Sequence, residues 1–206
     1  MKIILVAFFS TISSVVLGQY QAEEFQAALL EAKYGALLVY NGKSNSFSLK
    51  FESKNFKPTE KANFVLIDGV LMQSSLIPFQ EEIDFKKMDR MLQRKYLLAW
   101  KEYEKNWVEE QLKTKLTDKD IFVDLANRAF IYWSYNMPKV KSGSNVEKQV
   151  YLVGICFDQL LVLNGPVEKG KTEELVKTKL LTVAKTLMLY PGKVQDLEKL
   201  YNDLKK

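Results

Sequence analysis

The chain has no histidine and a single cysteine, Cys156. Without imidazole it cannot form a Ser-His-Asp or Cys-His nucleophile, and most zinc sites are excluded as well. One cysteine cannot form an intramolecular disulfide, and its place in an apolar run favours a buried small side chain. Any catalysis would have to use carboxylates, lysines or tyrosines. We therefore predict neither a cofactor nor a metal site, and we expect a non-catalytic role.

Repeats, low-complexity tracts and linkers rich in proline or glycine are also missing. The composition, 47% hydrophobic and 27% charged, is that of an ordinary globular protein. The net charge of +5 is spread over many lysines and accompanies no recognition motif, so nucleic acid is not an expected partner. These features predict one folded domain that binds a protein or a small ligand.

The first eighteen residues have the layout of a secretory signal peptide. Lys2 supplies a positive start, residues 3–17 form an apolar run with a few serines and threonines, and Gly18 is small. The run is shorter than the roughly 20 residues of a membrane span. We predict cleavage after Gly18 and a single α+β domain over residues 19–206. It would be secreted or periplasmic, without a transmembrane segment. The alternative is that residues 1–18 form a buried element.

An exported chain without disulfides or Asn-x-Ser/Thr acceptors favours a bacterial source. Its apolar spacing predicts a helix over residues 23–33. The pair Asp68-Gly69 between two apolar runs predicts a hairpin, since a type I′ turn needs positive φ at both central positions. Asp158-Gln159 is a second expected tight turn.

A long amphipathic helix is predicted over residues 84–113. Its apolar residues recur at spacings of three and four, the stripe that such a helix packs against a core. The stripe comprises Phe85, Met88, Leu92, Tyr96, Ala99, Tyr103 and Trp107. The opposite side carries Lys86, Arg90, Arg94, Lys101, Glu104, Lys105 and Glu109.

Residues 130–135 and 150–157 are strand-like and apolar on both faces, which predicts cover on both sides. A second helix begins near Glu173 and is expected to stop at Pro191-Gly192, before a short terminal helix over residues 194–204. The expected fold is an antiparallel β-sheet flanked by helices on both faces, a three-layer α/β/α sandwich.

The order of these elements resembles the PsbP-like superfamily of α/β/α sandwiches, named for an extrinsic photosystem II subunit. The resemblance lies in hairpin strands at residues 47–51 and 64–72, a long central helix, further strands and a closing helix from Thr172. It covers about residues 45–190. That superfamily consists largely of accessory and binding proteins, and the resemblance implies such a role here. No functional residue is carried over.

Residues 165–172 match the phosphate-binding P-loop pattern, with Lys171 and Thr172 in the positions that contact phosphates and Mg²⁺. Three features argue against nucleotide binding: no later strand supplies a second magnesium ligand, Glu168 places negative charge in the loop, and an exported protein meets almost no nucleoside triphosphate. In the alternative, the glycines turn the chain and Thr172 caps a helix.

Two other features allow chemistry. Asp68, Asp124 and Asp158 stand in or beside apolar strands, where paired carboxylates could hydrolyse a glycoside; structural roles in turns are the alternative. Trp133 and Tyr135 are candidate ligand-binding residues because their rings could stack on a ligand, whereas core packing is the alternative. The sequence thus predicts an exported, non-catalytic accessory or binding domain, with a carboxylate-dependent hydrolase as the alternative.

Overall fold

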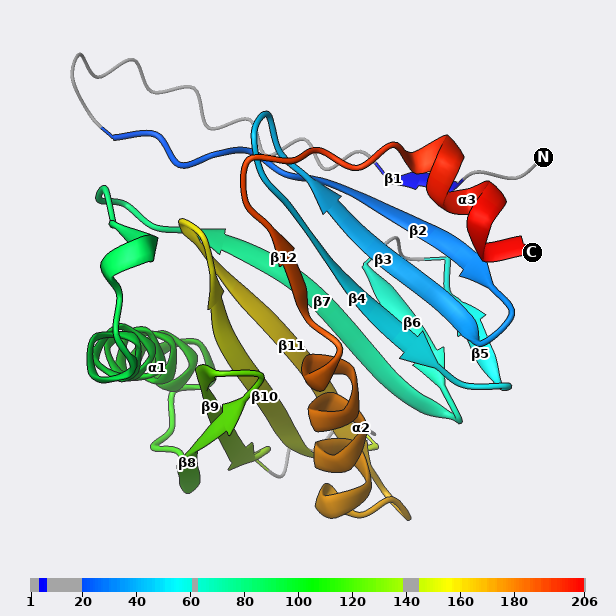
Figure 1. The fold of residues 1–206 in the computed structure, drawn as a ribbon. Coiled ribbons are helices and arrows are strands. Elements are labelled where there is room, and N and C mark those ends of the chain that lie inside the picture. The colour runs from blue at the N-terminus through cyan, green and yellow to red at the C-terminus, as the bar shows by residue number, and fades with distance from the viewer. Residues whose placement is uncertain (1–3, 7–19, 61–62, 139–144, 206) are drawn as a thin grey trace.

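The strands form two antiparallel sheets in the computed structural model, which describes residues 4–6, 20–60, 63–138 and 145–205 (Figure 1). The smaller sheet contains, in spatial order, β1 (Ile4–Val6), β2 (Gln26–Ala32), β3 (Gly35–Asn41), β4 (Ser46–Glu52) and β12 (Met188–Tyr190). The larger contains β5 (Phe56–Pro58), β6 (Phe64–Ile67), β7 (Val70–Pro78), β11 (Gln159–Glu168), β10 (Val146–Cys156), β9 (Arg128–Asn136) and β8 (Asp118–Leu125). The helices described are η1 (Phe85–Lys87, a 3-10 turn), α1 (Arg90–Leu112), α2 (Glu173–Lys185) and α3 (Leu197–Lys205).

Tight turns join the strands of the larger sheet. The predicted hairpin at Asp68-Gly69 is confirmed, because both residues have positive φ, 51° and 78°, between β6 and β7. The turn between β10 and β11 lies one residue earlier than expected. It consists of Phe157, with φ of 57°, and Asp158, since Gln159 already belongs to β11.

The helix predicted over residues 23–33 is wrong, because this segment contains strand β2. Its buried side chains alternate along the strand: Ala28, Leu30 and Ala32. The apolar residues expected on a helical face overlap with these, so the local pattern does not decide between the two structures. The segment is a strand through its antiparallel pairing with β3. Gly35 begins β3. Its φ is 133°, and a Cβ there would lie 2.2 Å from the carbonyl oxygen of Phe51, so only glycine suits the turn from β2 into β3.

Both faces of the larger sheet are covered, as its apolar strands predict. In β9, Phe130 and Tyr132 face a core shared with β3, β4 and α2. The alternate residues, Ile131 and Trp133, face a second core formed with α1. Figure 1 shows α1 and α2 at different sides of this sheet.

The predicted class, α+β with antiparallel strands, is confirmed, but the strands form two sheets rather than one. The smaller sheet exists because residues 26–32 are a strand and extend the pairing of β3 and β4. Together with α2 it covers the face of the larger sheet that lies opposite α1. Its own outer face packs against α3 through Leu197, Leu200 and Leu204.

The long helices begin and end near their expected positions. Asp89 caps α1 by accepting a hydrogen bond from the Leu92 N–H at 2.8 Å; the residues before it form η1. Helix α2 ends before Pro191-Gly192, because the short strand β12 intervenes and pairs with β4. Of the predicted signal peptide, only Ile4–Val6 lies within the described residues, as a strand paired with β2. The predicted cleavage point lies outside the described residues.

A close contact between the neighbouring strands β9 and β10 gives a test of the fold. Gly154 pairs with Phe130, and a Cβ at Gly154 would lie 2.4 Å from the Phe130 ring. We expect Gly154→Ala to lower the free energy of unfolding by about 1–3 kcal/mol, measured by urea denaturation, because the ring must move in a filled core. Adding Phe130→Leu should recover part of the loss. Equal stability of Gly154→Ala and the parent chain would contradict this packing.

Candidate functional site

Trp133 and Tyr135, the candidate ligand-binding residues, lie on β9 beneath α1. Trp133 is 0% exposed and Tyr135 is 6% exposed. The Trp133 ring centroid lies 5.0 Å from those of Tyr135 and Tyr151 and 6.1 Å from that of Trp100 on α1. These rings fill the core between helix and sheet. Their role in ligand binding remains a prediction, and the structure gives them a packing role.

The indole of Trp133 is also held by a buried ion pair. Trp133 Nε1 donates to Asp118 Oδ2 at 3.0 Å, and Lys101 Nζ lies 3.0 Å from the same oxygen. Lys105 contacts the other oxygen at 2.7 Å. Burial by itself would lower the pKa of Lys101, but its hydrogen bonds, that to Asp118 first, raise it. Burial would likewise raise the pKa of Asp118, but hydrogen bonds from the two lysines lower it.

Lys101 is one of several polar residues that α1 buries. Lys101 is only 4% exposed. Gln93 accepts a hydrogen bond from the Ala129 N–H at 2.9 Å, and Glu109 accepts one from the Leu116 N–H at 3.0 Å. A buried polar group without its partner would be costly. The contacts of Lys101 with Asp118 on β8 and of Gln93 with Ala129 on β9 therefore fix which side of α1 meets the sheet, while Glu109 holds the segment that follows the helix.

The stripe predicted to be buried consequently faces outward along much of α1. The apolar residues that α1 buries are Leu97, Trp100 and Val108. Tyr103 is 71% exposed and Trp107 is 50% exposed, and Leu92 and Ala99 are exposed with them. Tyr96 is partly covered by the edge of the Phe79 ring. The predicted burial is confirmed for Met88, which is 7% exposed, and Phe85 packs against both cores. It is wrong for Leu92, Ala99, Tyr103 and Trp107, because the buried side of α1 is chosen by polar contacts with distant strands.

Exposed apolar side chains are concentrated on this helix. Of the large hydrophobic residues that the described ranges expose, five belong to α1: Met91, Leu92, Leu98, Tyr103 and Trp107. Figure 1 places α1 at the margin of the described structure. Exposed aromatic and apolar residues in one area are typical of contact surfaces. We call the residues Leu92, Ala99, Tyr103 and Trp107, with partly covered Tyr96, the outer stripe of α1.

Residues 165–172 match the P-loop pattern, but they do not form the phosphate-binding loop that was the disfavoured third possibility. Residues 165–168 belong to β11 and pair with β10, so this part of the segment is a strand and not a loop around a phosphate. Lys171 Nζ donates to the Gly69 carbonyl oxygen at 2.6 Å and pairs with Glu168. Thr172 caps α2 by accepting from the Leu175 N–H at 3.2 Å, as the alternative predicted.

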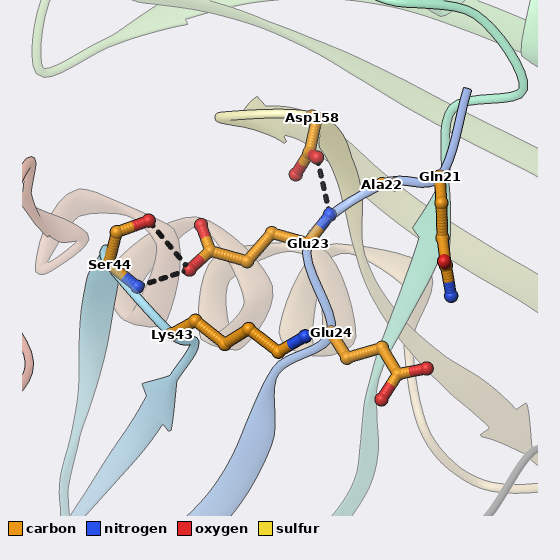
Figure 2. A pocket seen from close by; sticks show the side chains of 7 residues that line it. All are labelled: Gln21, Ala22, Glu23, Glu24, Lys43, Ser44 and Asp158. Atoms are coloured by element: carbon orange, nitrogen blue, oxygen red, sulfur yellow. Dashed lines mark hydrogen bonds between the residues drawn. The ribbon is translucent and has the colours of Figure 1, made fainter.

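The three aspartates considered for hydrolysis each bind neighbouring side chains: Asp68 binds Lys179, Asp124 binds Arg90 and Arg94, and Asp158 binds Tyr20. Such contacts favour structural roles for all three. Asp158 also lines a hollow of about 350 Å³, drawn in Figure 2, together with Gln21, Ala22, Glu23, Glu24, Lys43 and Ser44.

Hydrogen bonds already occupy the two central carboxylates of this hollow. Asp158 Oδ2 accepts from the Glu23 N–H at 2.6 Å, and Glu23 accepts from the N–H of Ser44 and the side-chain amide of Asn45, both at 2.6 Å. Burial would raise the pKa of Glu23, but the hydrogen bonds from Ser44 and Asn45 lower it. The carboxylates thus tie the segment before β2 to two turns.

Glu173, in the first turn of α2, is the centre of a polar cluster that the sequence did not reveal. It accepts hydrogen bonds from Tyr132 at 2.6 Å and Ser134 at 3.0 Å, and it pairs with Lys119 at 2.7 Å and Lys148 at 2.8 Å. Burial would raise its pKa, but the hydrogen bonds, those from the lysines first, lower the pKa to about 2. With two lysines and two hydroxyls already bound, this carboxylate anchors α2.

Comparison with known proteins gives a likeness of fold. No family model matches the sequence, and no curated protein matches it. The structure is similar to the solution structure of cyanobacterial PsbP from Synechocystis sp. PCC 6803, with a TM-score of 0.41 and 9% identity, covering 87% of this chain and 99% of that chain. The predicted resemblance to the PsbP-like superfamily is found here at the level of the fold, and it assigns no functional residue.

The described residues contain neither a membrane-spanning helix nor a cluster of metal-binding side chains. Their helices include none with the length and apolar character needed to span a bilayer. Their cysteine, aspartate and glutamate side chains form no group of three or more placed to hold a metal ion.

The Glu173 cluster predicts a pH-dependent contribution to stability. We expect Glu173→Gln to lower the free energy of unfolding at neutral pH by about 2 kcal/mol, the scale of hydrogen bonds to a charged group. Because the pKa of Glu173 falls from 4.5 to about 2 on folding, its contribution is complete above pH 4.5 and is lost as the pH falls toward 2. Urea titrations of both chains between neutral pH and pH 2 should therefore converge.

The adjacent Glu174 provides the matched control. Its pairing with Lys177 is exposed, so Glu174→Gln should change stability by less than about 0.5 kcal/mol at any pH. If Glu173→Gln is as stable as Glu174→Gln at neutral pH, the anchoring role of Glu173 is refuted.

Proposed function

We propose that this chain is an exported, non-catalytic binding domain and that the outer stripe of α1 is its docking surface for a protein. The observation that supports this proposal is the exposure of Tyr103 and Trp107 on a helix whose rotation is fixed by buried polar contacts. Aromatic side chains of this kind contribute much of the energy of protein interfaces. Their exposure is otherwise unfavourable for a soluble domain.

The charges around the stripe indicate what kind of protein segment fits it. Arg90 and Arg94 share the single carboxylate of Asp124, and exposed Lys95 follows them, so the N-terminal half of α1 has an excess of positive charge. The C-terminal half carries exposed Glu102 and Glu110. The complementary partner is an amphipathic helix with acidic groups toward the start of α1 and basic groups toward its end.

Export is the second part of the proposal and rests on residues 1–18, with their positive start, apolar run and closing Gly18. The functional surface would then act outside the cytoplasm, in the periplasm or beyond. The engagement of Asp68, Asp124 and Asp158 by neighbouring groups supports a binding role over the alternative of carboxylate-dependent hydrolysis.

Site-specific photo-crosslinking in the producing cells tests the docking surface. A photoreactive phenylalanine analogue in place of Tyr103 should give a discrete adduct of higher mass in the exported fraction, because Tyr103 lies in the middle of the proposed contact. The same analogue in place of Leu175, which is exposed on α2, is the control and should give none. Equal adducts from both positions, or none from Tyr103, would refute the proposed docking surface.

A further inference from the structure

We infer that the partner of the outer stripe is a second copy of this chain, with the two α1 helices packed antiparallel about a two-fold axis near Ala99. The inference rests on the proposed docking surface and names its occupant. It follows from two features of α1, the order of its exposed apolar residues and the order of its charges.

The outer stripe is symmetric about its middle. Leu92 and Trp107 lie at its two ends, Tyr96 and Tyr103 lie inside them, and Ala99 lies close to the centre. When such a helix meets an antiparallel copy, each end of the stripe meets the opposite end. Leu92 then packs against Trp107 of the second copy, and Tyr96 packs against Tyr103. This is the self-complementary pairing that a two-fold interface requires.

Ala99 suits the crossing point of the two helices. It is exposed in the single chain, and its small side chain lets the two helix axes approach closely, while larger residues on either side fill the space that opens away from the crossing. The length of α1, 23 residues, corresponds to about 35 Å of helix. The aromatic ends therefore lie well apart and reach opposite ends of the partner helix.

The charges are also self-complementary. Lys95 and Glu102 are two helical turns apart, so they share one flank of α1, and both are exposed. In an antiparallel pair a flank meets the same flank of the other helix, as e and g positions do in coiled coils. Lys95 of each copy therefore lies near Glu102 of the other, and the contact occurs twice. Oε1 of Glu102 contacts Lys101 at 3.1 Å, which leaves its second oxygen for this pair.

An anionic membrane surface is a poorer occupant. Glu102 and Glu110 are exposed beside the stripe and would be repelled by acidic headgroups, whereas a basic polar face is what membrane-surface helices need. The same two carboxylates are favourable in the antiparallel pair, because they meet the basic half of the second copy.

Charge exchange across the axis tests the inference. Analytical ultracentrifugation of the full chain over roughly 1–200 µM, the range in which small interfaces associate, should show a monomer–dimer equilibrium. Lys95→Glu alone and Glu102→Lys alone should each weaken the dimer by about tenfold, since like charges then face each other twice. An equimolar mixture of the two variants should associate as a heterodimer with the affinity of the parent chain. The double variant, Lys95→Glu with Glu102→Lys, should likewise form a homodimer.

Lys199→Glu is the matched control, because it makes the same charge change on exposed α3 and should leave the equilibrium unaltered. Leu92→Glu changes an exposed residue of the stripe. It should abolish the dimer, while the chain still shows a cooperative thermal unfolding transition. A monomer at every concentration overturns the inference, as does a mixture that associates no better than its components. If the chain co-sediments with phosphatidylglycerol vesicles and Trp107→Glu abolishes this binding, the occupant of the stripe is a membrane surface and the inference is overturned.

The outcome is separable from that of the crosslinking experiment. If Tyr103 gives an adduct whose mass is not that of two copies, the docking surface is retained and the second copy is rejected. If Tyr103 gives no adduct, the docking surface itself is rejected.

Discussion

The ion pair between Lys101 and Asp118 determines how α1 lies on the larger sheet. The pair is buried, and Asp118 also accepts the indole N–H of Trp133. Breaking a buried pair costs several times more than an exposed pair contributes, because a charge then remains without a partner. A rotation of α1 by one residue would break this pair together with the contact between Gln93 and the Ala129 N–H on β9. Tyr103 and Trp107 of the outer stripe are therefore left facing solvent.

Strand β8 connects both helices to the sheet by the same principle. Successive side chains of a strand point to opposite faces. Asp118 and Asp120 thus reach Lys101 on α1, whereas Lys119 between them reaches Glu173 on α2. The strand lies at the edge of its sheet, where charged side chains also discourage pairing with other chains. One short segment therefore orients a helix on each face.

The sequence predicted features that depend on near neighbours. The Asp68-Gly69 turn, the cap at Thr172 and the cover on both faces of β9 and β10 all follow from local residue types and were confirmed. Strand β2 was missed because its apolar residues suit both periodicities, and its pairing with β3 is not part of the local pattern. Candidate sites depended even more on distant residues.

The rotation of α1 shows why the candidate sites could not be predicted from local patterns. Its sequence contains two apolar stripes, one with Tyr103 and Trp107 and one with Leu97, Trp100 and Val108, and the first is the longer. The second is buried because Lys101 beside it finds Asp118 on another strand, a pairing that no local pattern contains. The same limit applies to Glu173, whose partners come from three strands.

Covalent footprinting of the dilute chain tests the orientation of α1 most directly, because Lys95 and Tyr103 are exposed whereas Lys101 is buried on another side of the helix. Hydroxyl radicals should oxidise Tyr103 rapidly, and Lys101 should resist acetylation while Lys95 reacts. Protection of Tyr103 together with rapid acetylation of Lys101 would show that another side of the helix faces the sheet, and it would contradict the account.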